Sequence, residues 1–177
     1  MSSEIRLRTD EEAREAIRQY LTSMDVEIVN EMEEKGNWGF WIRFGEYPLL
    51  IDHRKGSHYC IVAFQITIPD EHAIGHLNEF YEKNDAKFIY ELTRAFTSAL
   101  TAYSRILDGN RVVGFTVTKY IYPYHPEFTM RVLDMALQAV VSTGAVGISF
   151  LRWMVKELQV EHEPPAGPGG GPGPMFE

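Results

Sequence analysis

The sequence predicts an α+β domain: a helix, an antiparallel sheet of three to four strands, a helix, a β-hairpin and a long C-terminal helix. Three observations carry this prediction. Residues 127–158 have a thin polar stripe that repeats about every 3.6 residues, and the stretch between Asp134 and Arg152 is uncharged. Residues 26–68 contain runs of alternating polar and apolar residues. Residues 108–110 (Asp-Gly-Asn) form a strong hairpin signal between two further alternating runs.

The first helix is expected to begin at Thr9 or Asp10, either of which can cap it, and to end near Met24. Its opening turn holds Glu11 and Glu12, whose negative charge suits the positive end of a helix dipole. The last of the strands that follow is nearly continuous in apolar residues, which indicates burial on both faces and a central position in the sheet. These strands are expected over residues 26–33, 38–44, 49–51 and 59–68.

The second half begins at Pro69, which ends the fourth strand and can open a short helix. Ile74, Leu77 and Tyr81 support a couple of helical turns there. Asn84 is expected to cap a stronger helix, because apolar residues then recur at helical spacing. The apolar residues of this helix are Phe88, Leu92, Phe96 and Ala99. The hairpin strands are expected over residues 101–107 and 111–122.

The long helix is apolar or small over most of its circumference, so most of its circumference must be covered. A small sheet covers one side, and we therefore expect a second subunit to cover the other. Gly144 and Gly147 mark either a bend or the close approach of another backbone. One side of the helix carries Phe128, Val132, Met135, Ala139, Val146, Phe150 and Trp153. The other side carries Leu133, Leu137, Val140, Ile148, Leu151 and Val155.

Aromatic residues in the strands provide a second candidate surface. Trp41 follows Phe40 in a strand, so the two side chains point to opposite faces. Exposed Trp and Tyr are favoured at interfaces, although helices on both faces of the sheet would bury them instead. We expect a dimer or partner interface that contains Val140, Gly144, Gly147, Ile148, Leu151, Trp41 and Tyr122.

Composition narrows the classes of partner. The net charge of -8 argues against nucleic acid and against anionic membrane surfaces, both of which attract clustered Lys and Arg. The uncharged run from Met135 to Leu151 reaches only the short limit for a membrane span, and its polar residues fall on one stripe as in a soluble helix. The single cysteine, Cys60, and the polar N-terminal stretch favour a cytoplasmic protein without a signal peptide.

The chain is divided into three parts by composition. Residues 1–8 are expected to be a flexible N-terminus, and residues 9–160 a single domain. Residues 161–177 are rich in Pro and Gly and cannot bury enough apolar surface to order themselves. They are expected to form a flexible tail.

One histidine cluster carries the alternative class, a small metalloprotein or hydrolase. His72 and His76 are four residues apart, with Glu79 three further on, a spacing that can place two imidazoles and a carboxylate on one helix face for a metal ion. Position 73 is Ala73 rather than the glutamate of a zinc-protease motif. A pair of surface histidines beside acidic residues remains the plainer interpretation.

A second cluster, Asp52, His53 and His58, invites a general-base interpretation. Adjacent strand residues point to opposite faces, so Asp52 is poorly placed to orient His53, and a solvated turn is the plainer account of the cluster. Cys60 could share a face with His58, which would lower its thiol pKa, or be a buried structural cysteine. We expect no catalytic residue and no cofactor.

A resemblance to a known family rests on the order of the elements and on three stretches. These stretches are residues 84–92, the hairpin, and the uncharged helix that ends in residues 150–154. On these the chain resembles an uncharacterised, mainly archaeal domain-of-unknown-function family with the type III secretion chaperone-like (YbjN-like) fold. The resemblance implies an antiparallel sheet backed by helices, and many members of that superfamily are homodimers. It supplies no catalytic residue. We therefore expect a chaperone-like, homodimeric module that binds protein or peptide and performs no catalysis.

Overall fold

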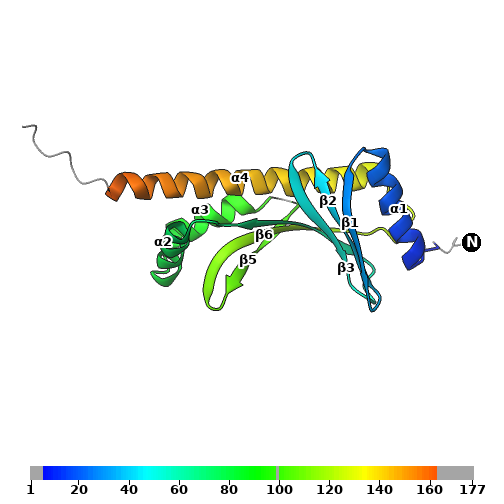
Figure 1. The fold of residues 1–177 in the computed structure, drawn as a ribbon, viewed down its shortest axis with the longest axis horizontal. Coiled ribbons are helices and arrows are strands. Elements are labelled where there is room, and N and C mark those ends of the chain that lie inside the picture. Colours follow the sequence, from blue (N-terminus) through cyan, green and yellow to red (C-terminus); the bar gives the residue numbers. More distant parts are fainter. Residues whose placement is uncertain (1–5, 99, 163–177) are drawn as a thin grey trace, which may run out of the picture.

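The computed structural model describes residues 6–98 and 100–162, with backbone alone for residues 157–162. The described chain is an α+β fold in which the long helix α4 runs across one side of a single sheet (Figure 1). In chain order the elements are α1 (Asp10–Ser23), β1 (Glu27–Glu34), β2 (Asn37–Phe44), β3 (Tyr47–His53), β4 (Cys60–Thr67), α2 (Glu71–Glu82), α3 (Ala86–Phe96), β5 (Ala102–Asp108), β6 (Arg111–Ile121) and α4 (Met130–His162).

The sheet has six antiparallel strands in the order β1-β2-β3-β4-β6-β5. The expected sheet of three to four strands is therefore too small, because in the described residues the predicted hairpin adds two strands to it. The hairpin belongs to the same sheet because β6 pairs with all of β4, from Cys60 opposite Ile121 to Thr67 opposite Gly114. Strand β4 is interior, as predicted, because β3 and β6 flank it.

One face of the sheet carries the core, with Phe40, Val62 and Phe115 buried on it. Helix α1 contacts β1, α2 contacts β6, and α4 contacts β4 and β6. The residues of β4 that point the other way include Gln65 and Thr67, which are exposed. The prediction that β4 is buried on both faces is therefore wrong, because the helical layer meets the face that carries Val62.

The helix starts follow local capping chemistry. Thr9 caps α1 in a capping box, in which Glu12 N donates to Thr9 Oγ1 over 3.2 Å and Thr9 N donates to Glu12 Oε2 over 2.8 Å. Helix α3 is capped by Asp85 rather than by the expected Asn84, whose φ of 49° places it in the left-handed region. Helix α4 is one uninterrupted helix, and no bend interrupts it at Gly144 or Gly147.

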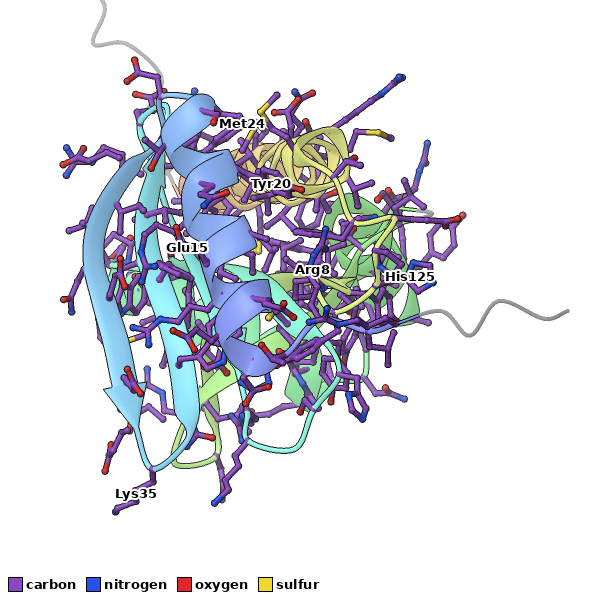
Figure 2. All side chains as sticks on the ribbon, turned by 90° about the vertical axis from the view of Figure 1, so that its right-hand side faces the viewer. Arg8, Glu15, Tyr20, Met24, Lys35 and His125 are labelled. Carbon is purple, nitrogen blue, oxygen red and sulfur yellow. The ribbon has the colours of Figure 1, made fainter. Side chains whose placement is uncertain are left out.

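The segment before α1 is tied to the loop that leads into α4. Arg8 N donates to Tyr124 O over 2.8 Å, and Arg8 Nη1 donates to the carbonyl oxygens of Pro123 and His125 over 2.8 and 2.9 Å. Figure 2 shows Arg8 beside α1, between this helix and the loop that carries His125. Arg8, within the expected flexible stretch 1–8, is therefore held against the fold, whereas residues 1–5 and 163–177 lie outside the described residues and their flexibility stays a prediction.

Candidate functional site

The core-facing side of α4 is formed by residues that the sequence analysis assigned to a partner contact. Val140 is fully buried and Leu151 nearly so, both within the core of this one chain. Ile148 is half-buried and packs against the same core. This part of the expected interface is therefore corrected: these side chains are already covered by the chain's own sheet and helices.

The two glycines of α4 explain how closely the helix approaches the sheet. A Cβ atom at Gly144 would lie 2.3 Å from Phe64 Cδ1, and one at Gly147 would lie 2.1 Å from Phe96 Cε1. Both distances are far below van der Waals contact, so any side chain would force the rings to move. Neither predicted role holds as stated: α4 is one continuous helix without a bend, and the groups that approach the glycines are side chains of the same chain rather than another backbone.

The opposite side of α4 is exposed and largely apolar. Val132, Met135, Val146 and Trp153 are 43%, 52%, 56% and 56% exposed. With the small residues Ala139, Ser142 and Ser149 they follow one another at steps of three and four residues. We call these seven residues the α4 stripe. Its spacing is that of a seam at which two helices pack side by side, and it spans about 32 Å at about 1.5 Å per residue.

A groove of about 470 Å³ begins where the α4 stripe begins. Val132 lines it, together with Leu7, Tyr120, Tyr122 and Phe128. Leu7, Tyr120 and Tyr122 are themselves among the exposed large hydrophobic residues. The α4 stripe and the groove therefore form one continuous apolar surface.

The same groove borders an open edge of the sheet. Strand β5 first pairs with β6 at Ala102, opposite Thr118. Beyond Thr118, Tyr120 and Ile121 pair with β4 alone. An unpaired strand edge is a template for an added strand, so the edge at Tyr120 offers backbone hydrogen bonds beside apolar pockets.

A second groove, of about 700 Å³, lies between the C-terminal half of α4 and the segment from β4 to α2. Phe64, Ile66 and Leu151 line its apolar part, and Arg152 and Lys156 lie at its rim. It is separate from the groove at Val132, and it provides a second site for an apolar side chain.

Trp41 and Tyr122 differ in their surroundings. Trp41 is half-buried on the face opposite to the core, in register with Leu50, which is in turn opposite Ala63. Tyr122 is 59% exposed, at the end of β6. Of the expected interface residues, Tyr122 thus lies on the groove beside the α4 stripe, whereas Trp41 lies on another face of the sheet.

A chain of hydrogen bonds, buried at His53 and Tyr124 and exposed at Asp10, joins three segments that are distant in sequence. Tyr124 Oη donates to Asp10 Oδ1 over 2.6 Å and lies 2.8 Å from His53 Nε2. The Tyr124 oxygen therefore accepts from His53 Nε2–H, which also lies 3.1 Å from Ser57 O. Burial first, and then the carboxylate of Asp10, raise the pKa of Tyr124, which keeps its hydroxyl protonated.

The solvated-turn interpretation is wrong for His53. This residue is fully buried, and its ring stacks on that of Trp38 with a centroid separation of 4.6 Å. Asp52 points elsewhere, and its carboxylate lies 3.5 Å from Arg54 Nε. The cluster joins α1, β3 and the loop before α4. No sequence signal connected Asp10 and His53 to Tyr124, because the three are brought together only by the fold.

Cys60 is a buried structural cysteine, one of the two predicted alternatives. Burial, and then the charges of Asp52 and Asp10, raise the pKa of its thiol well above the ordinary value. The alternative of a lowered pKa beside His58 is therefore wrong. The ring of His58 instead meets that of Tyr124 edge-on at 5.8 Å.

The histidine pair on α2 is brought together. His72 Nε2 and His76 Nε2 are 3.0 Å apart, and His76 Nδ1 lies 3.8 Å from Glu79 Oε2. Glu79 thus approaches the other nitrogen of His76 and does not join the pair as a third ligand. Within residues 6–98 and 100–162, no three His, Cys, Asp or Glu side chains are grouped so as to hold a metal ion.

One helix in the described part of the chain, over Met130–Lys156, is long and apolar enough to cross a membrane by length and composition. Its most apolar window of 18 residues has a mean hydropathy of 1.5, and 39% of that window is buried inside the fold. Core helices of soluble proteins pass the same test. The expectation that the protein binds no membrane stays a prediction.

Comparison with known proteins identifies the fold alone. No protein-family model matches the chain, and no curated protein matches it. Among solved structures, the chain is similar to an uncharacterised protein from Methanothermobacter thermautotrophicus, with a TM-score of 0.60 and 13% sequence identity. The match covers 82% of this chain and 98% of that one. An archaeal, uncharacterised neighbour is consistent with the resemblance stated above.

Proposed function

We propose that this protein is a homodimeric module that binds a segment of another protein and performs no catalysis. The observation that carries the proposal is the α4 stripe, an apolar seam on the solvent side of a helix whose other side is already buried. Isolated exposed apolar residues are ordinary, but a contiguous row at helix-packing spacing is typical of an interface. The type III secretion chaperone-like fold and a cytoplasmic location are the finer assignments that we propose with it.

The occupant of the α4 stripe is a second copy of the same helix. Three of the seven stripe residues, Ala139, Ser142 and Ser149, are small and lie among the large ones, and small residues let two helix backbones approach closely. Arg131 and Asp134 lie beside the stripe, so its flanks carry both signs of charge and do not simply repel an identical copy.

The mass of the particle in solution tests the dimer. We expect sedimentation velocity at micromolar concentration to give twice the chain mass, and we expect Val146→Glu to give a monomer because it buries a charge in the seam. Leu107→Glu is the matched control: Leu107 has the same exposure as Val146 but lies on β5. A monomeric wild-type protein would contradict the proposal. So would a dimer that Leu107→Glu disrupts and Val146→Glu does not.

The groove at Val132 and the adjoining edge of β6 hold the partner segment. An extended chain can add to the edge at Tyr120 while its alternate side chains enter the groove. This arrangement favours an apolar, extended peptide, whose main chain supplies hydrogen bonds and whose side chains replace water on Tyr122.

Peptide arrays presenting extended apolar segments provide the test. We expect Tyr122→Ala to weaken binding of the selected peptides by about tenfold, the loss typical of an aromatic interface residue. Tyr90→Ala is the control, since Tyr90 is similarly exposed but lies on α3, away from the groove. Equal losses in both variants would show that the groove does not bind the peptide.

A further inference from the structure

We propose that His72 and His76 form a bidentate site for a divalent transition-metal ion, with copper(II) and nickel(II) preferred over zinc. The two residues occupy adjacent turns of α2, and their Nε2 atoms lie 3.0 Å apart. This site is distinct from the α4 stripe, and its argument does not depend on the proposed binding function.

The separation of the two nitrogens fits simultaneous ligation. Imidazole nitrogens bind these metals at about 2.0–2.1 Å, so two nitrogens 3.0 Å apart subtend an angle of about 90° at a shared ion. A right angle suits square-planar and octahedral coordination, the geometries of copper(II) and nickel(II), better than the tetrahedral coordination of zinc. The intrinsic affinity order of these metals also favours copper.

Glu79 lies on the other side of His76. Its carboxylate is 3.8 Å from His76 Nδ1, which is beyond hydrogen-bond distance, so Glu79 has to move closer before it can accept the Nδ1 proton. Metal-binding histidines commonly turn their second N–H toward a carboxylate, which fixes the tautomer and makes the ligating nitrogen more basic. To bind the ion, each histidine must carry its proton on Nδ1, so that the lone pair of Nε2 is free. In this tautomer both His72 and His76 can donate an Nε2 lone pair to the same ion.

The backbone that carries the pair is held at both ends. Asp70 Oδ1 accepts a hydrogen bond from His72 N over 3.0 Å and so caps α2 immediately before the site. Two turns later, Asn78 bonds to both the N–H and the carbonyl of Val112 on β6. A fixed helix backbone limits the entropy lost on binding, and the ion replaces the hydrogen bond that the two imidazoles share in this structure.

The surrounding carboxylates are engaged elsewhere. Glu71 pairs with Arg111, and Glu79 lies 3.5 Å from Lys83 Nζ. The protein therefore contributes two nitrogen ligands, and water fills the remaining positions of an ion in the shallow cavity between Glu71 and Glu79. Such a site binds a metal ion reversibly, in contrast to the closed four-ligand sites that have a purely structural role.

Isothermal titration of the full chain with copper(II) and with nickel(II) tests the site. We expect one saturable equivalent, with His72→Ala and His76→Ala each lowering the affinity more than about tenfold and Glu79→Gln lowering it less. His58→Ala, an exposed histidine on another loop, is the control and should bind as the wild type does. The electron paramagnetic resonance spectrum of the copper complex should show coupling to two imidazole nitrogens.

Two outcomes would overturn the proposal. One is the absence of saturable binding. The other is unchanged binding in the variant that carries both His72→Ala and His76→Ala, which would show that the ion binds elsewhere on the chain. Circular dichroism of each variant establishes that the fold is retained, which we expect because His72 is exposed and His76 does not belong to the hydrophobic core.

Discussion

Helices α1 and α4 belong to the same helical layer and contact each other, yet their solvent sides are opposite in character. The outer side of α1 is charged, and its inner side carries Ala13, Ile17 and Leu21. The outer side of α4 carries Val146 and Trp153 in place of charges. The comparison shows that a buried inner face does not determine what the outer face must be.

The charges of α1 are matched to the neighbouring strand. Arg18 pairs with Glu15 on its own helix and with Glu31 on β1, where Arg18 Nη2 and Glu31 Oε2 are 2.6 Å apart. Arg14 also reaches Glu31, over 3.2 Å, and pairs with Glu33. The side chains that α1 exposes to water are mostly charged or polar, and several form ion pairs, whereas those that the α4 stripe exposes to water are largely apolar. That difference is the physical reason for placing the proposed dimer contact on α4.

The largest effect that we expect sharpens the contrast between the two sides of α4. Leu137→Ala should lower the free energy of unfolding by about 3 kcal/mol, because Leu137 is fully buried and its loss leaves a cavity. Met135→Ala, two residues away on the α4 stripe, should change it by less than about 0.5 kcal/mol in the monomer. Urea denaturation at low protein concentration measures both free energies of unfolding. Equal losses of stability in the two variants would contradict the assignment of one side of α4 to the core and the other to solvent.

The next effect concerns the close approach at Gly147. Gly147→Val should destabilise the fold by about 2 kcal/mol, because the new side chain would overlap the ring of Phe96, which is packed against Phe115. Ala145→Val is the control on the same helix, at a half-buried position outside the core. Thermal unfolding followed by circular dichroism compares the two, and a stable Gly147→Val protein would mean that the helix can move away from α3.

The smallest effect tests the charged side of α1. The hydrogen bond from Arg18 lowers the pKa of Glu31 below its ordinary value of 4.5. Because the unfolded chain holds this proton more tightly, the pair adds stability above about pH 4.5 and loses it as the pH falls through the lowered pKa of the folded state. The pair is partly exposed, so Glu31→Gln should cost less than about 1 kcal/mol at pH 7.

The pH dependence of that cost is the measurement. The difference in unfolding free energy between the wild type and Glu31→Gln should shrink toward zero between pH 7 and pH 3. Glu46→Gln, which changes an exposed carboxylate in the turn between β2 and β3, should show no such trend. A difference that grows on acidification would contradict the role assigned to Arg18.

Much of the local structure was predictable because it depends on neighbours in sequence. Thr9, one of the two expected caps, does cap the first helix, and the hairpin turn at Gly109 lies where the Asp-Gly pair indicated. The count of strands in the sheet was not predictable in this way. Pairing of β4 with β6 joins Cys60 to Ile121, and alternation within either strand says only that each needs a neighbour, not which one.

The candidate sites also depend in part on local spacing, which the sequence shows, and in part on tertiary packing, which it does not. Spacing alone brought His72 and His76 onto one face of α2, because four residues make about one helical turn. Periodicity also separated two apolar sides of α4, but Phe128 and Phe150, which were assigned to the side that faces solvent, pack in or against the core. Which side meets the sheet was decided only by tertiary packing, since Leu151 and Val146 are similarly apolar, and burial depends on the rings that approach each side. Phe64 and Phe96 approach the side that carries the two glycines, and the opposite side is left to water or to a second copy.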